Sequence, residues 1–129
     1  MKLGYTIVYV PDVEASLSFF ENAFGLKRRF LHESGDYGEL DTGPTTLAFA
    51  SLELGESNFP EGFVAASNSH KPLGMEIALV TEKVAAAHAN ALVNGAEEIR
   101  APQSKPWGQT VSYLRCPAGV LVELCSPMG

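Results

Sequence analysis

A glutamate stands in the middle of an otherwise apolar stretch near the end of the chain. The stretch Val120-Leu121-Val122-Glu123-Leu124-Cys125 is rich in β-branched and aliphatic residues and predicts a strand. Because successive side chains of a strand point to opposite faces, Glu123 lies on the face away from its apolar neighbours. Glu76 is placed in the same way in the apolar run 75–80. Two such carboxylates could attract a cation, hold a divalent metal or move a proton.

The other side chains able to do chemistry carry weaker signals. His88 falls in an alanine-rich helical segment, where we expect a partly exposed helix residue, and His32 and His70 have no partner at metal-ligand spacing. Cys116 and Cys125 are roughly 30 Å apart along an extended chain, so we expect two free thiols and no disulfide. No base stands near either cysteine in the sequence, which argues against nucleophilic catalysis.

The order of predicted elements is the same in the two halves of the chain. The first half predicts a strand at 3–10, a helix from Asp12 to Gly25, and strands at about 27–33, 37–42 and 45–52. The stretch 54–74 is rich in Gly, Ser, Asn and Pro and predicts a linker. The second half then predicts a strand at 75–80, a helix at 82–94, and strands at about 97–101, 109–115 and 120–125.

This order indicates an internal repeat of a β-α-β-β-β unit. The segment 5–8 aligns with 76–79, and 46–49 aligns with 121–124. If a helix covers one face of each small sheet, the other two faces are free, and we expect them to close into a shared cup. The side chains predicted on the free faces are Tyr5, Ile7, Tyr9, Glu76, Ala78, Leu121 and Glu123.

Composition limits the class of protein. The 129 residues suit one domain, with 46% hydrophobic and 19% charged residues and no low-complexity segment. The net charge of −6 argues against a nucleic-acid partner, and no apolar run is long enough to predict a membrane span. The first residues lack the layout of a signal peptide, so we expect a reduced, cytoplasmic protein.

Three longer segments carry a family resemblance. The opening VPDVEASLSFFENAFGL, the hairpin ELDTGPTTLAF and the closing PWGQTVSYLRCPAGVLVEL resemble the vicinal oxygen chelate superfamily. This superfamily groups glyoxalase I, bleomycin-resistance proteins, extradiol dioxygenases and fosfomycin-resistance enzymes. The resemblance implies a single α+β domain over 1–129, with a module at about 1–53, a linker at about 54–74 and a module at about 75–129. The duplicated βαβββ modules would form a curled eight-stranded mixed sheet around a central cleft, with helices outside and a homodimer as the assembly.

The resemblance also implies four positions that hold a metal in the metal-using members. They fall at Tyr5, Ala48, Glu76 and Glu123. Ala48 cannot ligate, and a neutral tyrosine is a poor ligand for a hard divalent ion. We therefore expect no cofactor and no tightly bound metal, with Glu76 and Glu123 left as ligands for a weak divalent metal site.

Two functions from different classes remain, and whether the protein is an enzyme stays open. In the first, the protein sequesters a small molecule, cationic or aromatic, in the cleft, as bleomycin-resistance proteins do. In the alternative, it is a divalent-metal-dependent lyase, isomerase, transferase or dioxygenase. A purely structural dimer module is a third reading. The glutamates could also be solvated on an open sheet face, and Trp107 could be either a stacking wall or a loop anchor. The predicted ligand-binding residues are Tyr5, Tyr9, Ala48, Glu76, Trp107 and Glu123.

Overall fold

The computed structural model describes residues 1–128, and its first half is a four-stranded sheet covered by one helix. Strand β4 pairs with β1 in parallel and with β3 antiparallel, giving the order β1-β4-β3-β2. Helix α1 packs on one face of this sheet. The elements of this module 1 are β1 (Tyr5–Val10), α1 (Val13–Phe24), β2 (Lys27–Leu31), β3 (Tyr37–Asp41) and β4 (Thr46–Ser51).

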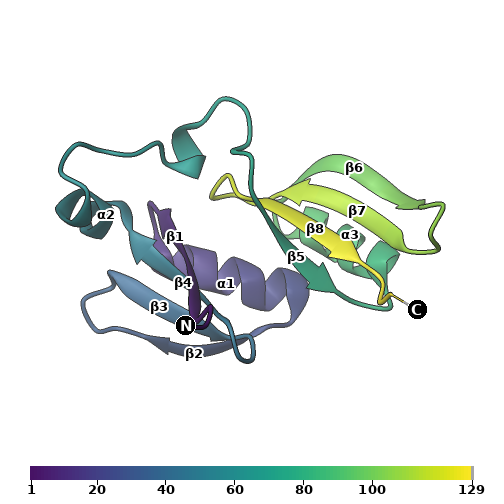
Figure 1. The fold of residues 1–129 in the computed structure, drawn as a ribbon, viewed down its shortest axis with the longest axis horizontal. Helices are drawn as coiled ribbons and strands as arrows, with labels where there is room; N and C mark the ends of the chain where they lie inside the picture. Colours follow the sequence, from purple (N-terminus) through teal and green to yellow (C-terminus); the bar gives the residue numbers. More distant parts are fainter. Residues whose placement is uncertain (129) are drawn as a thin grey trace.

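The second half repeats this arrangement with the sheet order β5-β8-β7-β6. Figure 1 shows the two sheets in separate halves of the molecule, with the linker crossing above them. The elements of this module 2 are β5 (Glu76–Val80), α3 (Val84–Val93), β6 (Glu97–Ser104), β7 (Thr110–Arg115) and β8 (Leu121–Cys125). The predicted α+β fold of duplicated βαβββ modules is confirmed.

The two sheets do not join into one curled sheet. Within residues 1–128, strand β1 pairs only with β4 and β5 only with β8, so the strands form two four-stranded sheets. The modules meet instead through α1 and α3. The Asn90 side chain of α3 donates hydrogen bonds to the carbonyl oxygens of Asn22 and Ala23 at the end of α1, at 2.9 and 3.0 Å. Within one chain, the free sheet faces are therefore not closed over each other.

The helices begin and end where local chemistry favours it. The Asp12 carboxylate caps α1 by accepting a hydrogen bond from the Ala15 N–H at 2.9 Å, and Gly25 ends the helix with a left-handed φ of 70°.

Between the modules the chain forms a short helix, α2 (Leu52–Asn58), and a single 3₁₀ turn, η1 (Ala66–Asn68). The sequence predicted no regular structure in this linker. Helix α2 forms because Ser51 caps it by accepting from the Leu54 N–H at 3.1 Å.

A β-bulge occurs at equivalent places in the two modules. In module 1, Arg28 and Phe30 oppose Leu40 and Glu39, so Arg29 is the extra residue. In module 2 the same shift occurs where Glu98 and Arg100 oppose Leu114 and Tyr113. Because a bulge redirects the side chains next to it, the duplication preserves this local geometry as well as the order of elements.

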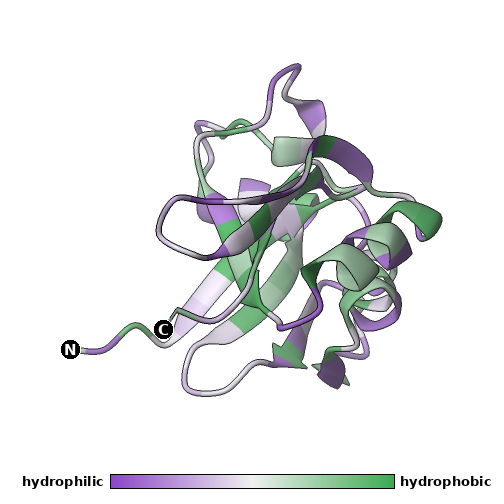
Figure 2. Cartoon of the chain, turned by 90° about the vertical axis from the view of Figure 1, so that its right-hand side faces the viewer, coloured by the Kyte–Doolittle hydropathy of each residue, from purple (hydrophilic) through white to green (hydrophobic). Residues whose placement is uncertain are grey.

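One hydrophobic core forms between the sheets and their helices. In Figure 2, green hydrophobic bands run through the central strands and helices, and most peripheral loops are purple or white. Phe20 and Phe49 are completely buried in module 1, and Leu114 and Leu124 in module 2. Cys116 and Cys125 are buried and free, as predicted. Among the described residues, no helix has the length and apolarity needed to cross a membrane.

The prediction of a partly exposed His88 is wrong. His88 is only 4% exposed, and its Nδ1 lies 2.9 Å from the Ser112 hydroxyl while its Nε2 lies 2.7 Å from a carboxylate oxygen of Glu98. Its position on the core-facing side of α3 buries the ring. Because both ring nitrogens have polar partners, the burial leaves no ring nitrogen unsatisfied.

Candidate ligand-binding site

The free face of module 2 carries a pair of carboxyl groups in contact. Glu76 lies on β5 and Glu123 on β8, where Ala78 is the register partner of Glu123. Glu76 and Ala78 share a face, so the two glutamates are diagonal neighbours. A hydrogen bond that the protonated Glu76 carboxyl donates to Glu123, together with burial and the negative charge of Glu123, raises the pKa of Glu76 to about 7. Glu76 therefore holds its proton up to near neutral pH.

Tyr113 and Cys125 lie next to Glu76 and Glu123, and we call these four residues the acidic cluster. The sequence did not single out Tyr113 or Cys125 as site residues. Tyr113 lies on β7 directly opposite Glu123. Burial raises the pKa of Tyr113, and the charge of Glu123 and a hydrogen bond to it act in the same direction. The pKa of the Cys125 thiol is raised by burial and then by Glu123. The strand register between β7 and β8 was the signal that could have identified Tyr113.

The acidic cluster lacks a compensating cation. Within residues 1–128, the ion pairs of the chain do not include Glu76 or Glu123. Arg115 follows Tyr113 on the same face of β7, but its guanidinium binds backbone carbonyls of the linker, those of Ala66 and Ser69 at 3.1 and 2.8 Å. A cationic ligand group would supply the charge that the chain does not.

Tyr5 and Ala48 lie on the free face of the other sheet. Tyr5 pairs in register with Thr46 on β4, and Ala48 pairs with Ile7 on β1. Tyr5 is 57% exposed, whereas Ala48 is completely buried. The structure thus brings Glu76 and Glu123 together, and it leaves these two predicted residues in module 1.

Module 1 has its own polar cluster on this face, which the sequence pattern did not indicate. Glu39 is 7% exposed and accepts hydrogen bonds from the Tyr37 hydroxyl at 2.7 Å and from Arg29 at 3.3 Å. Arg29 also donates to the Thr46 hydroxyl at 3.0 Å. Burial, followed by the hydrogen bond to Glu39, raises the pKa of Tyr37. In this cluster the buried carboxylate has a cationic partner.

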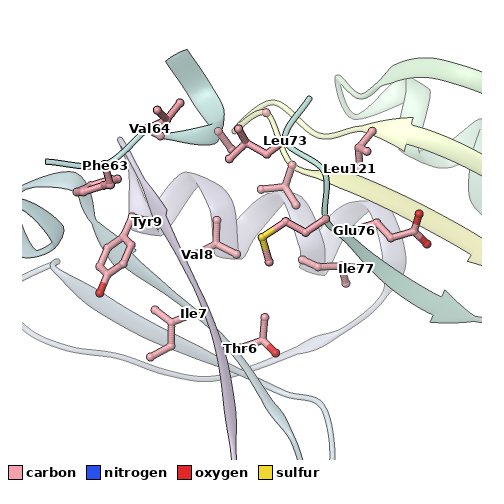
Figure 3. Close-up of a pocket in the computed structure, with 15 residues that line it drawn as sticks. Thr6, Ile7, Val8, Tyr9, Phe63, Val64, Leu73, Glu76, Ile77 and Leu121 are labelled. Carbon is pink, nitrogen blue, oxygen red and sulfur yellow. The ribbon is translucent and has the colours of Figure 1, made fainter. Parts of the chain in front are cut away.

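A mostly apolar pocket of about 190 Å³ lies between β1 of module 1 and β5 of module 2, beside the linker. It is lined by residues 6–9 of β1, 63–66 and 73 of the linker, 75–77 at the start of β5, and 119–121 before and at the start of β8. Figure 3 shows Tyr9 and Phe63 at one end of the pocket and Glu76 at the other, with the Glu76 carboxylate directed away from Tyr9. Two of the predicted site residues, Tyr9 and Glu76, therefore share this pocket.

Trp107 lies apart from these groups, in the turn between β6 and β7. Its ring is 61% exposed, its Nε1–H donates to the Gln109 side chain at 2.8 Å, and the Lys105 ammonium lies 6.0 Å from the ring centroid. It does not line the pocket of Figure 3. The structure does not bring Trp107 together with the other predicted residues.

The residues present do not fit a tight metal centre. Among residues 1–128, no group of three or more His, Cys, Asp or Glu side chains is placed to hold a metal ion. Glu76 and Glu123 are two oxygen ligands, and the position aligned with Glu123 in module 1 is Ala48. Structural and catalytic zinc sites use at least three protein ligands.

Comparison with solved structures supports the fold. A glyoxalase-related enzyme from Fulvimarina pelagi superposes with a TM-score of 0.83 at 18% identity, covering 98% of this chain and 88% of that chain. A glyoxalase/bleomycin resistance protein/dioxygenase family enzyme from Burkholderia phytofirmans PsJN gives a TM-score of 0.81 at 19% identity, with 98% of both chains covered. TioX from Micromonospora sp. ML1 gives a TM-score of 0.71 at 16% identity, also over 98% of both chains. At these identities the likeness shows the fold alone.

The sequence itself gives the family. No curated protein sequence matches the chain. The family model described as Glyoxalase/Bleomycin resistance protein/Dioxygenase superfamily matches residues 2–124, which is nearly the whole chain. The chain belongs to the Glyoxalase/Bleomycin resistance protein/Dioxygenase superfamily.

Proposed function

We propose that the protein binds a small cationic or aromatic molecule at the module 2 free face and the adjoining pocket, without a tightly bound metal. The observation that carries this proposal is the contact between Glu76 and Glu123, which have no cationic partner within residues 1–128. Two carboxyl groups held together disfavour each other's ionisation, and a bound cation relieves that cost. The aromatic side chains of Tyr9 and Phe63 beside the pocket add surfaces on which a ring can stack.

The test uses aromatic ammonium ions as probes, with benzylamine and benzyltrimethylammonium measured by titration calorimetry at neutral pH. We expect Glu76→Gln and Glu123→Gln each to weaken binding about tenfold, because each removes a charge from the pair. Glu33→Gln is the matched control, since Glu33 is exposed in the turn between β2 and β3 and far along the chain from either carboxylate. Equal affinities for all three variants would overturn the proposal.

The absence of a tight metal is part of the proposal and has its own measurement. Elemental analysis of protein purified without added metal should find less than stoichiometric zinc, nickel or iron. A stoichiometric metal that is lost in Glu123→Ala would instead favour the metal-dependent enzyme.

We also propose a homodimer in a reducing, cytoplasmic setting. Two large apolar side chains of β1, Tyr5 and Ile7, are 57% and 44% exposed on the free sheet face, and a second copy could cover them. The two free thiols are compatible with a reducing compartment. Light scattering at micromolar concentration should give twice the 13.8 kDa mass of one chain; the mass of a single chain would contradict the dimer.

A further inference from the structure

The pocket between the modules has the size and lining of a site for one ring. Its volume is about 190 Å³, and an apolar cavity of about 150 Å³ is large enough to hold benzene. Its walls come from both modules and from the linker, so it exists only when the modules are held in this arrangement. A single aromatic ring or an alkyl chain of about six carbons matches this volume, whereas a fused polycyclic system exceeds it.

The linker that roofs the pocket is fixed at both ends. On the module 1 side, the Phe63 ring lies 5.3 Å from the Tyr9 ring and packs over Gly55, where any side chain would collide with it. On the module 2 side, Arg115 holds the Ala66 carbonyl at 3.1 Å. A Cβ on Gly119 would lie 2.3 Å from the same carbonyl oxygen, so the turn before β8 approaches the linker as closely as only glycine allows. The roof is therefore part of the packed structure.

The polar groups of the pocket are unequally distributed. The Tyr9 hydroxyl, at one end, is already bonded to the Asn58 side chain at 3.2 Å. At the other end, Glu76 lines the pocket and its carboxylate is directed away from Tyr9 (Figure 3), while Glu123, its neighbour on β8, is not among the lining residues. The ligand that complements this layout is apolar along the pocket and positively charged at the Glu76 end.

We infer that the pocket binds the apolar part of a primary amine with one ring-sized group, and that the ammonium group lies at the Glu76 end. This inference rests on the proposed function and adds the place and the size of the ligand. An ammonium at that end lies next to the Glu76 carboxyl, which itself contacts Glu123, whereas a carboxylate ligand would add a further negative charge to a chain whose net charge is −6. A neutral alcohol of the same shape would fill the pocket without supplying the missing counter-charge.

Ring size separates this pocket from the open sheet face. Benzylamine, benzyl alcohol and pyrenylmethylamine are titrated into the wild-type protein. In the pocket, the single ring fits and the four-ring system does not, so we expect benzylamine to bind about tenfold more tightly than either of the other two. On an open face the order of the two amines would reverse, because the larger ring system buries more apolar area.

A pair of matched variants tests the location. Met75 lines the pocket and is 69% exposed, whereas Met128 is 72% exposed and is not a lining residue. Met75→Trp should occupy the pocket and weaken benzylamine about tenfold, and Met128→Trp should leave its affinity unchanged. Melting curves show whether both variants fold. If Met75→Trp does not fold, the relative affinities of benzylamine and pyrenylmethylamine for the wild-type protein still show whether the ligand lies in the pocket.

The outcomes separate the inference from the proposed function. If benzylamine binding depends on Glu76 and Glu123 but pyrenylmethylamine binds more tightly and Met75→Trp has no effect, the ligand lies on the open face. The pocket inference is then wrong and the proposed function stands. If none of the ammonium probes binds the wild-type protein, both are overturned.

Discussion

The two modules share a backbone plan but use different side chains at the same places in it. Helix α1 presses Leu17 onto Gly38 of β3, and a Cβ on that glycine would lie 2.6 Å from Leu17 Cδ1. At the equivalent place in module 2, helix α3 presents His88 to Ser112 of β7. An apolar contact in one module is thus replaced by a buried hydrogen bond in the other. The duplication preserved geometry and let the chemistry of the contact change.

The free faces differ in the way their carboxylates are compensated. In module 1, Glu39 is buried and accepts from Arg29 and Tyr37. In module 2, Glu123 contacts Glu76 with no ion-pair partner among the described residues. A satisfied network stabilises the fold, whereas a like-charged pair is costly and is typical of a site that meets a ligand. The comparison favours module 2 as the half that binds the charged part of a ligand.

The largest expected difference between the modules concerns the glycine in each module's last turn. Gly43 and Gly119 have φ values of 87° and 93°, which alanine adopts only with strain. Nothing lies within 4 Å of a Cβ on Gly43, but a Cβ on Gly119 meets the Ala66 carbonyl oxygen at 2.3 Å. We expect Gly43→Ala to lose about 1 kcal/mol of unfolding free energy and Gly119→Ala about 3 kcal/mol, measured by urea denaturation. Equal losses would show that the linker is not held against this turn.

The next effect concerns the contact between helix and sheet. His88→Leu removes the hydrogen-bond partner of the Ser112 hydroxyl, which is completely buried, and brings a leucine against the Ser112 Cβ. We expect a loss of about 2 kcal/mol of unfolding free energy. The double variant His88→Leu/Ser112→Gly reproduces the Leu17–Gly38 contact of module 1, so it should recover about half of that loss.

One result of the double-mutant cycle would contradict the equivalence of the two helix–sheet contacts. If the two substitutions are additive, the two positions are not coupled, and the equivalence between the modules does not extend to this contact. Urea denaturation of the wild type, both single variants and the double variant provides the four free energies that the cycle needs.

Most of the fold was predictable from the sequence because its signals are local. Alternating strands, the Asp12 cap and the Gly25 stop predicted the β-α-β-β-β order, and its recurrence predicted the duplication. Helix α2 was missed because its seven residues include a glycine and an asparagine, which are poor helix formers and outweighed the Ser51 cap and Glu53 in the first turn.

The site was predictable only in part because it depends on pairing between distant segments. The alternation rule placed Glu76 and Glu123 on one face, and the parallel register of β5 and β8 makes them neighbours. His88 was misjudged because an alanine-rich helix gives little contrast between its buried and exposed sides. The separation of the two sheets could not be derived from strand patterns, because it depends on the packing of α1 against α3.

The smallest expected effect tests the contrast between the two carboxylate clusters directly. The pKa of Glu76 is raised from 4.5 to about 7, so the folded protein holds this proton more tightly than the unfolded chain does. Its contribution to stability is therefore fully present below about pH 4.5 and is lost as the pH rises through about 7. Because Glu76 is exposed to solvent, we expect this loss to be only about 1 kcal/mol after screening.

Glu76→Gln removes the titrating group and should flatten this part of the pH profile, leaving the variant as stable as the wild type or slightly more stable at neutral pH. Glu39→Gln is the matched comparison in module 1, and it should lose about 2 kcal/mol at the same pH because it removes the charge that pairs with Arg29 and leaves one acceptor oxygen for the two donors Arg29 and Tyr37. Thermal and urea unfolding of the two variants across this pH range provides the measurement. If Glu76→Gln instead destabilises the protein as much as Glu39→Gln does, Glu76 stabilises the fold, and the charged part of the ligand site must be sought elsewhere.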